Sequence, residues 1–391
     1  MIKYTLLIIF CLAQVPQSFA DSFSWSKESF KETLKPSRDP ASTRRDLKKK
    51  KLKAVDPNLF RFRDHRRKKQ LTILIFGDSG TGGVDQYQVG KRMYEECQKE
   101  GCDFGILLGD IIYPKGFSKS RLPNLSEENL EEATEKFELP YKSFGQFDFW
   151  LVPGNHDWYG DIQKSINYTL KSPRWKMPFN HYEIPWLPRW VRMYGLDTTR
   201  IERLDHDSGL VKEQMEMANK MYKARTGLVE KESFCKSRGW KILFGHHGIY
   251  TSGRHGRLDM ARPLRMLNPF RQKGENRHMK ETLLPFIKKC GVQILVVGHD
   301  HHQEYIKAID PKTKRVIYYQ VLQGAAGKIR ITKKVKHPEF KSTVRSSDFG
   351  FSIITLTPEK ANVKYFGYPE GHPEKFKMYF ETDILLKEFK E

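Results

Sequence analysis

The sequence is poor in cysteine, and none of its five cysteines stands in a CxxC pair. Such scattered spacing argues against a structural zinc cluster. A bridge between Cys97 and Cys102 is one arrangement for an exported chain, and buried free thiols are the other. Zinc-finger spacing and the aromatic motifs of RNA-binding domains are also missing, so we expect no sequence-specific recognition of nucleic acid.

Long apolar runs are absent beyond the N-terminal stretch, so no later segment is expected to cross a membrane. Residues 1–20 have the features of an export signal, because Lys3 precedes an apolar stretch and Ser18 and Ala20 are small residues near the expected cleavage point. An uncleaved anchor is the alternative, but the run is shorter than the ~20 residues that span a bilayer. We therefore expect secretion, or export to the periplasm or to a secretory or lysosomal lumen.

The net charge of +22 is concentrated near the N-terminus. Residues 44–69 contain thirteen Lys or Arg against three Asp, a balance of +10. Such a block repels itself and lacks an apolar helical face, so residues 21–69 are expected to form a flexible basic arm or a strap along the surface. Residues 44–69 could contact an anionic polymer or an acidic membrane surface by counterion release. A solvated linker that proteases cut is the alternative.

From Leu71 onward one pattern recurs five times: a short apolar run, a glycine, and then Asp, Asn or His. Continuous apolar runs indicate strands buried on both faces, and the stretches between them have helical spacing. This alternation predicts an α/β fold, with one catalytic domain over residues 70–391. Ligands gather outside the carboxyl ends of such strands, so the five pairs should meet on one rim. The pairs are Gly77-Asp78, Gly109-Asp110, Gly154-Asn155, Gly245-His246 and Gly298-His299.

The glycine-rich stretch after the first run raises a different interpretation, a nucleotide-binding loop. GDSGTGGV lacks both the Lys-Ser/Thr ending of a phosphate loop and the GxGxxG spacing of a dinucleotide fold. Oxygen ligands combined with imidazoles favour two metal ions instead. Two ions about 3.5–4 Å apart can clamp the attacking and leaving oxygens of a displacement at phosphorus, so the rim predicts phosphoester hydrolysis.

The motifs resemble those of the metallophosphoesterase superfamily, and within it the purple acid phosphatases of the tartrate-resistant type. The superfamily usually begins with Asp-x-His, but Gly80 stands where that histidine would be. The purple branch carries a tyrosine three residues after its bridging aspartate, and Tyr113 follows Asp110 at that spacing. The later motifs occur in the family's order. The resemblance implies a four-layer α/β/β/α sandwich in which two mixed β-sheets pack face to face.

The resemblance also implies an acid phosphatase that hydrolyses phosphomonoesters of small molecules or proteins by attack of a metal-bound hydroxide. His156 and His255 would be the catalytic residues that face the phosphate, and His156 would protonate the leaving group. The implied Fe(III) ligands are Asp78, Asp110, Tyr113 and His301. The implied ligands of a divalent ion (Fe, Zn or Mn) are Asp110, Asn155, His246 and His299.

Several neighbouring residues are expected to support the site without binding metal. His247 should pack beside it, Asp157 should hold a loop, and Asp300 and His302 should point away from the rim and brace the ligands. Residues 257–277 form either a basic lid over the site or a solvated loop. Two other functions stay open at this point: a phosphodiesterase or nucleotide pyrophosphatase of the same fold, and a phosphatase-fold scaffold without activity.

Overall fold

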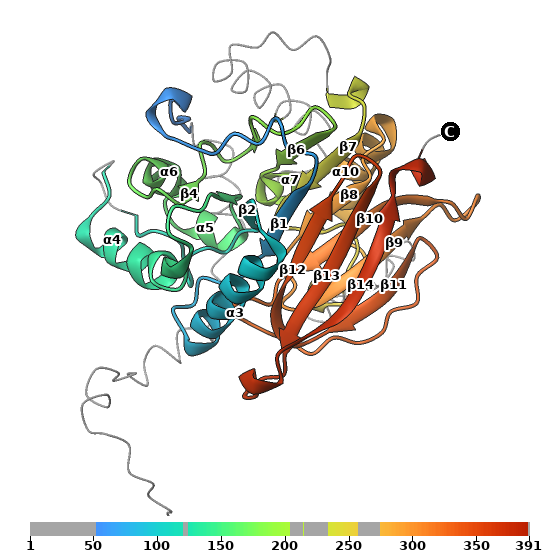
Figure 1. Ribbon diagram of the computed structural model, residues 1–391. Coiled ribbons are helices and arrows are strands. Elements are labelled where there is room, and N and C mark those ends of the chain that lie inside the picture. The colour runs from blue at the N-terminus through green and yellow to red at the C-terminus, as the bar shows by residue number, and fades with distance from the viewer. Residues whose placement is uncertain (1–51, 120–123, 204–213, 215–233, 257–273, 390–391) are drawn as a thin grey trace, which may run out of the picture. The chain divides into compact units, whose positions relative to one another are not determined.

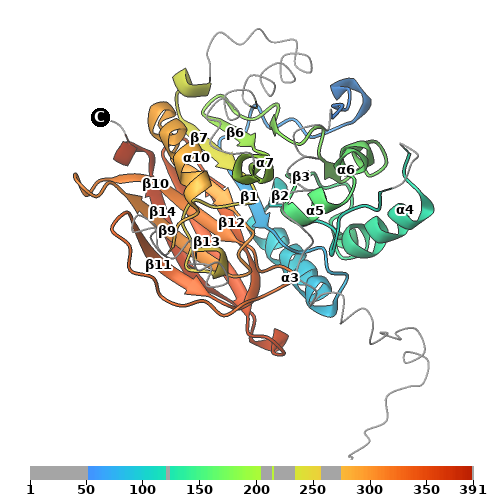
Figure 2. The ribbon, with the colours of Figure 1, turned by 180° about the vertical axis from the view of Figure 1, so that it is seen from behind.

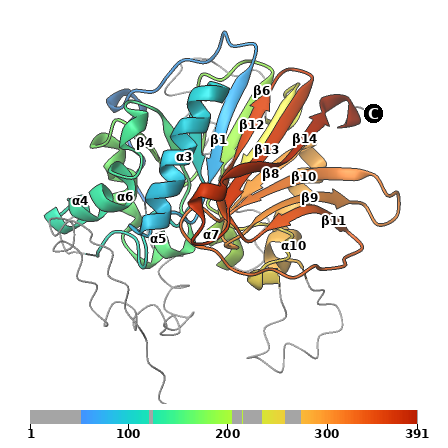
Figure 3. The same ribbon diagram turned by 60° about the horizontal axis from the view of Figure 1, so that its bottom comes forward.

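The computed structural model describes residues 52–119, 124–203, 214, 234–256 and 274–389. The predicted export signal, the first part of the basic arm and most of the predicted lid lie outside these ranges. The described segments form two mixed β-sheets that lie against one another, with helices on their outer sides (Figures 1 and 3). The expected fold class is therefore confirmed. Within the described residues, no helix has the length and apolar character needed to span a membrane.

The first sheet is organised around β1, in which all six residues are buried. Its neighbours are β2, which runs parallel to it, and β12, which runs antiparallel. A central strand covered on both faces requires an uninterrupted apolar sequence, and LTILIF provides one. Across the sheet the strands are β14 (Lys377–Leu385), β13 (Lys360–Tyr368), β12 (Phe349–Leu356), β1 (Leu71–Phe76), β2 (Phe104–Leu107), β3 (Phe149–Leu151) and β4 (Trp175–Lys176).

The second sheet has the same construction around β8, whose four residues are also buried. The strands β7 and β10 flank β8 and run parallel to it, so three carboxyl ends lie side by side. Antiparallel strands continue the sheet beyond β10. Its order is β11 (Phe340–Ser346), β9 (Gln303–Ile309), β10 (Val316–Gln323), β8 (Ile294–Val297), β7 (Trp240–Phe244), β6 (Val191–Gly195) and β5 (Tyr182–Glu183).

The helices begin and end at residues suited to those positions. The longest of the described helices, α3 (Val84–Glu100), contacts β1 and β12 and is followed by Gly101, which adopts a φ of 72°. At the start of α10 (Arg277–Cys290) the side chain of Asn276 accepts a hydrogen bond from the first turn. Figure 2 shows α10 beside α7 on the side of the second sheet. The shorter helices are α4 (Glu127–Ala133), α5 (Asn155–Tyr159), α6 (Ile162–Asn167) and α7 (Thr198–Arg203).

Two disulfides join segments next to helix ends. Cys97 and Cys102 connect the end of α3 to the loop before β2. Cys235 and Cys290 connect a 3₁₀ turn, Phe234–Lys236, to the end of α10. The first bond is one of the two arrangements expected from the sequence. The second was not predicted, because its cysteines are 55 residues apart and spacing alone does not pair them.

Residues 52–69, the second part of the predicted basic arm, form a strap along the folded body. Val55 and Phe60 are buried, and the Val55 N–H donates to the carbonyl of Pro178 at 2.9 Å. Further along, the Arg63 N–H donates to the carboxylate of Asp148 at 2.7 Å. The apolar residues within the charged run therefore anchor it, and the strap alternative describes this part of the chain.

Candidate metal centre

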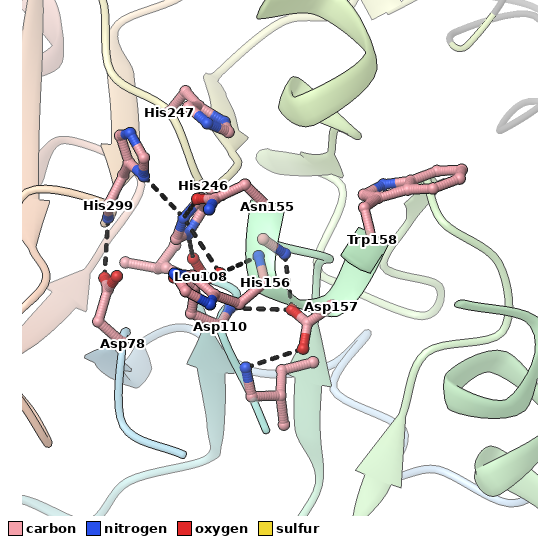
Figure 4. Close-up of polar contacts among 12 residues, drawn as sticks. Asp78, Leu108, Asp110, Asn155, His156, Asp157, Trp158, His246, His247 and His299 are labelled. Atoms are coloured by element: carbon pink, nitrogen blue, oxygen red, sulfur yellow. Dashed lines mark hydrogen bonds and ion pairs between the residues drawn. The ribbon is translucent and has the colours of Figure 1, made fainter. Parts of the chain in front are cut away.

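The five Gly-X pairs lie at the carboxyl ends of β1, β2, β3, β7 and β8 and bring their side chains to a single rim (Figure 4). Their glycines are required by close packing. A Cβ on Gly154 would lie 2.1 Å from Asp110 Oδ1, and one on Gly109 would lie 2.7 Å from His246 Nδ1. Both distances are far below van der Waals contact, so only glycine lets the strand ends approach one another.

The first cluster surrounds the hydroxyl of Tyr113. This hydroxyl lies 2.8 Å from Asp110 Oδ2, 3.2 Å from Asp78 Oδ1 and 3.3 Å from His301 Nε2. Burial, followed by the two carboxylate charges, raises the pKa of Tyr113 well above its ordinary value, so without a cation the phenol keeps its proton. Burial lowers the pKa of His301 to about 3, which leaves its imidazole neutral and able to coordinate a metal.

The second cluster surrounds His246 Nε2. This nitrogen lies 3.0 Å from His299 Nδ1, 3.1 Å from Asn155 Oδ1 and 3.4 Å from Asp110 Oδ1. Burial lowers the pKa values of both imidazoles below their ordinary value, and the surrounding histidines lower that of His299 further. All four predicted ligands of the divalent ion therefore lie together, and their histidines are neutral.

Asp110 belongs to both clusters. Its Oδ2 accepts the hydrogen bond from Tyr113, whereas its Oδ1 faces His246 and accepts the backbone N–H of His156 at 2.9 Å. The carboxyl group is buried, so its two oxygens are held in fixed directions. One carboxylate thus stands between two groups of donors, which is the arrangement that lets a carboxylate bridge two ions.

The hydrogen-bond pattern of His246 tests whether a cation fits here. Its Nδ1 lies 2.6 Å from the carbonyl oxygen of Leu108, which can only accept, so Nδ1 carries the hydrogen. The lone pair of Nε2 therefore points toward the oxygens of Asp110 and Asn155. A cation between this lone pair and the carboxylate and amide oxygens would turn their mutual repulsion into coordination. The donor set fits a metal ion.

Three of the predicted ligands have unusual backbone conformations. Asp78, Asp110 and His299 have φ angles of 57°, 53° and 69°, in the left-handed region that L-residues rarely adopt. Such residues cost about 1–3 kcal/mol each and cluster at functional sites. These conformations turn each side chain sharply from its strand toward the rim.

The two predicted catalytic histidines stand beside different clusters. The His156 ring packs edge-on against Tyr113, with centroids 4.6 Å apart, and its Nδ1 lies 2.5 Å from the carbonyl of Pro114. The His255 ring lies over that of His299, with centroids 3.8 Å apart. His156 remains partly exposed, with 30% of its side chain accessible, so its Nε2 can meet a substrate.

Of the neighbouring residues, Asp157 and Asp300 have structural contacts of the expected kind. Asp157 accepts the N–H groups of Asp110, Ile111 and Gly154, which fixes the ends of β2 and β3. Asp300 accepts the hydroxyl of Thr251 and the N–H of His255, which places the loop that carries this histidine.

His247 was expected to pack beside the site, and its ring lies against the second cluster. A ring nitrogen of His247 lies within 4.8 Å of nitrogens of His246 and His299. Strand alternation does not separate His247 from His246, because β7 ends at Phe244 and the next residues are in a turn. The hydroxyl of Thr198 lies 3.1 Å from Nδ1 of His247. The same hydroxyl accepts the backbone N–H groups of His246 and His247.

Sequence reasoning missed Lys328, which follows β10 at the same rim. Its Nζ lies 3.4 Å from the centroid of the Tyr113 ring. The signal was an apolar run that ends in glycine, VIYYQVLQ before Gly324, but no Asp, Asn or His follows it. Burial lowers the pKa of Lys328, and the carboxylates of Asp110 and Asp78 oppose that shift.

A third group of potential ligands, Glu275, His337 and Glu339, lies apart from the rim. Here a lysine supplies the positive charge: Lys280 Nζ lies 2.8 Å from Glu275 and forms a second ion pair with Glu339. His337 Nδ1 accepts the N–H of Glu339, so its Nε2 carries the hydrogen and offers no lone pair. This group has its own cation and does not resemble the rim.

Two donor clusters that share one carboxylate, at the ends of strands in a two-sheet sandwich, define a metal-dependent phosphoesterase. The chain belongs to the calcineurin-like phosphoesterase family, whose model matches residues 71–303. It is therefore a hydrolase of phosphate esters, as the sequence motifs predicted.

Relatives and solved structures agree with this assignment. Tartrate-resistant acid phosphatase type 5 of Mus musculus is 24% identical over 70% of this chain and 78% of its own length. Purple acid phosphatase 3 of Arabidopsis thaliana is 28% identical over 61% of this chain and 60% of its own. The predicted resemblance to purple acid phosphatases is thereby confirmed.

Two solved structures share the fold at low identity. GAP50, the anchor in the inner membrane complex of Plasmodium, has a TM-score of 0.60 at 18% identity and covers 81% of this chain and 89% of its own. The purple acid phosphatase PPD1 of yellow lupin seeds has a TM-score of 0.54 at 15% identity, covering 83% of this chain and 56% of its own. At these identities the likeness concerns the fold alone.

Proposed function

We propose that the chain is an exported acid phosphatase that hydrolyses phosphomonoesters at a centre of two metal ions. The observation that carries the proposal is the position of Asp110, whose two oxygens face different donor clusters. In this proposal Tyr113 and His301 belong with the ferric ion, and Asn155 and His246 belong with a divalent ion, either Fe, Zn or Mn. The remaining ligands are Asp78 on the ferric side and His299 on the divalent side.

When bound, the two ions would supply Lewis acidity toward the phosphate and lower the pKa of a water molecule. The chain itself supplies orientation and protons. His156 Nδ1 donates to the Pro114 carbonyl, which fixes the ring and leaves Nε2, 4.0 Å from Asp110 Oδ2, free to face the leaving oxygen. The leaving oxygen would take its proton from Nε2 of the ring in the form that carries a hydrogen on both nitrogens. His255 stands over His299 on the other side, so the two histidines can contact a phosphate that lies across both clusters.

The sharpest experiment concerns Tyr113. We expect a violet protein whose colour comes from charge transfer between the Tyr113 phenolate and Fe(III), and expect Tyr113→Phe to abolish the visible band. Tyr159→Phe is the matched control, because Tyr159 packs beside His156 but bonds to Arg203 instead of the donor clusters. A wild-type enzyme that contains iron and is active but colourless would contradict the assignment of Tyr113.

Metal content and substrate preference separate the proposal from the two alternatives. Two tightly bound metals per chain are expected after reconstitution, and fewer than one would favour a scaffold without activity. Initial rates on an aryl phosphomonoester should exceed those on the matching aryl phosphodiester. Faster turnover of the diester would instead identify a phosphodiesterase on the same fold.

A further inference from the structure

Lys328 is held next to the metal centre by the backbone of its own loop. The N–H of Ala326 donates to the carbonyl of Gly77 at 3.3 Å, and the N–H of Arg330 donates to the carbonyl of His301 at 2.7 Å. These bonds connect the loop to the segment that carries Asp78 and to the turn after β8 that carries His299 and His301. The position of Lys328 is therefore fixed on both sides and differs from that of a freely mobile surface lysine.

The Lys328 ammonium contacts a ring instead of an acid. Its Nζ lies 3.4 Å from the centroid of Tyr113, and the side chain is half-buried. Among the residues that the structure describes, Nζ makes no hydrogen bond, and neither Asp78 nor Asp110 comes within the 4.0 Å of an ion pair. Lys328 thus does not fill the space between the two carboxylates as a substitute for a metal ion.

A cation over an aromatic face is attracted by the negative face of the π system, and the attraction increases when the site is desolvated. For a phenolate the attraction is stronger, because the negative charge is shared between the oxygen and the ring. Nζ stands above the ring itself and not above the hydroxyl, which is directed to Asp110. The positive charge is consequently closer to the ring electrons than to the donor cluster at the oxygen.

We propose that Lys328 is a positioning residue that sets the electron-donating strength of Tyr113 by holding a positive charge against its ring. This inference rests on the proposed function, in which Tyr113 binds a ferric ion. A fixed positive charge stabilises electrons on the ring and raises the energy needed to move one of them to the metal. The visible band of the loaded protein should therefore lie at shorter wavelength than the same band without Lys328.

The test compares visible spectra of reconstituted proteins with equal iron content. Lys328→Met, which keeps the length of the side chain and removes the charge, should move the band to longer wavelength. Lys328→Arg should leave it close to the wild-type position. Lys333→Met is the control, because Lys333 is an exposed cation five residues further along the chain and has no contact with Tyr113 among those described. The band of this variant should not move. Lys328→Gln provides a second neutral variant if the Met variant does not load iron.

An unshifted band in both neutral variants, with iron content maintained, would overturn the inference while leaving the proposed function intact. An unshifted band together with a raised KM for a phosphomonoester would assign Lys328 to substrate binding instead, which also overturns it. A colourless wild-type protein that contains iron would overturn the assignment of Tyr113, and this inference with it. If the band of Lys333→Met shifted as far as that of Lys328→Met, the shift would come from the loss of any nearby positive charge. That result would refute the contact between Lys328 and the Tyr113 ring as its cause.

Discussion

Replacing Asp78 with asparagine should stabilise the metal-free protein, although the same change should weaken the metal-loaded one. Asp78 and Asp110 are buried, and their oxygens lie within 4.8 Å of each other. Two unit charges at 4.8 Å repel by about 3 kcal/mol at an effective dielectric constant of about 20, which sets the scale of the gain. A cation reverses this balance, because each carboxylate then stabilises the bound metal.

The hydrogen bonds of Asp78 permit the substitution. Its Oδ2 accepts the His299 N–H at 2.8 Å, and an asparagine carbonyl can do the same. The new amide group would face the Tyr113 hydroxyl, which can accept a hydrogen bond while it donates to Asp110. The loss should be limited to about 1 kcal/mol, the usual net value of one bond, so a net gain near 2 kcal/mol is expected.

The dependence on pH has a definite sign. Burial and the charge of Asp110 raise the pKa of Asp78 above its ordinary value, so the folded metal-free protein binds this proton more tightly than the unfolded chain. The resulting stability is present below the unfolded pKa, about 4, and is lost as pH rises through the folded pKa. The free energy of unfolding of metal-free Asp78→Asn should depend less on pH over this window. The stability difference between this variant and wild type should therefore grow as pH rises.

Urea denaturation of chelator-treated wild type and Asp78→Asn at several pH values measures the gain in stability. In metal-reconstituted samples the same comparison should show a loss of stability for the variant. Asp64→Asn is the control, because its exposed carboxylate pairs only with Arg66 among the described contacts, so its effect should stay within about 0.5 kcal/mol. A metal-free Asp78→Asn protein that is no more stable than wild type at neutral pH would refute the reasoning, since the protein would then compensate both charges without a cation.

Two further substitutions test the rim. Gly154→Ala would place a Cβ 2.1 Å from Asp110 Oδ1 and should displace that carboxylate, so bound metal and activity should both fall. Gly371→Ala is the control, because its Cβ would have no neighbouring atom within 4 Å, and it should lower stability only. Normal metal content in Gly154→Ala would contradict the packing argument. His156→Ala should lower kcat about 10²–10⁴-fold for alkyl phosphates and less for aryl phosphates, whose leaving groups need no proton, and equal losses on both substrates would exclude His156 as the acid.

The sequence alone predicted the fold class and a rim of converging ligands, because both depend on local patterns. An apolar run followed by glycine and a polar residue is visible in the chain, and parallel neighbours bring such endings together. Asp78 and His299, 221 residues apart, were placed at one rim by this reasoning, and the structure joins them by a hydrogen bond of 2.8 Å. Their assignment to particular ions stays a prediction.

The residues that were missed depend on tertiary contacts that leave no local pattern. Lys328 reaches the rim from the loop after β10, where Gly-Ala follows the strand instead of glycine and a ligand, so nothing in the local sequence suggested a role. His247 lies on the same side as His246 because β7 ends at Phe244, so the turn that follows does not alternate as a strand does. The bond between Cys235 and Cys290 follows from the approach of a short turn to α10, which only the folded chain reveals.

The strap of residues 52–69 determines which N-terminal processing the folded body can tolerate. Basic pairs that a protease could recognise occur both before it, at residues 48–51, and inside it, at residues 66–69. Cleavage at the first position leaves every strap contact in place. Cleavage at the second would release the strap segment whose Phe62 ring packs against Trp186, three residues after the short edge strand β5. A sheet edge with less cover nearby is more open to pairing with another chain, so cleavage at residues 66–69 should promote self-association, whereas cleavage at residues 48–51 should not.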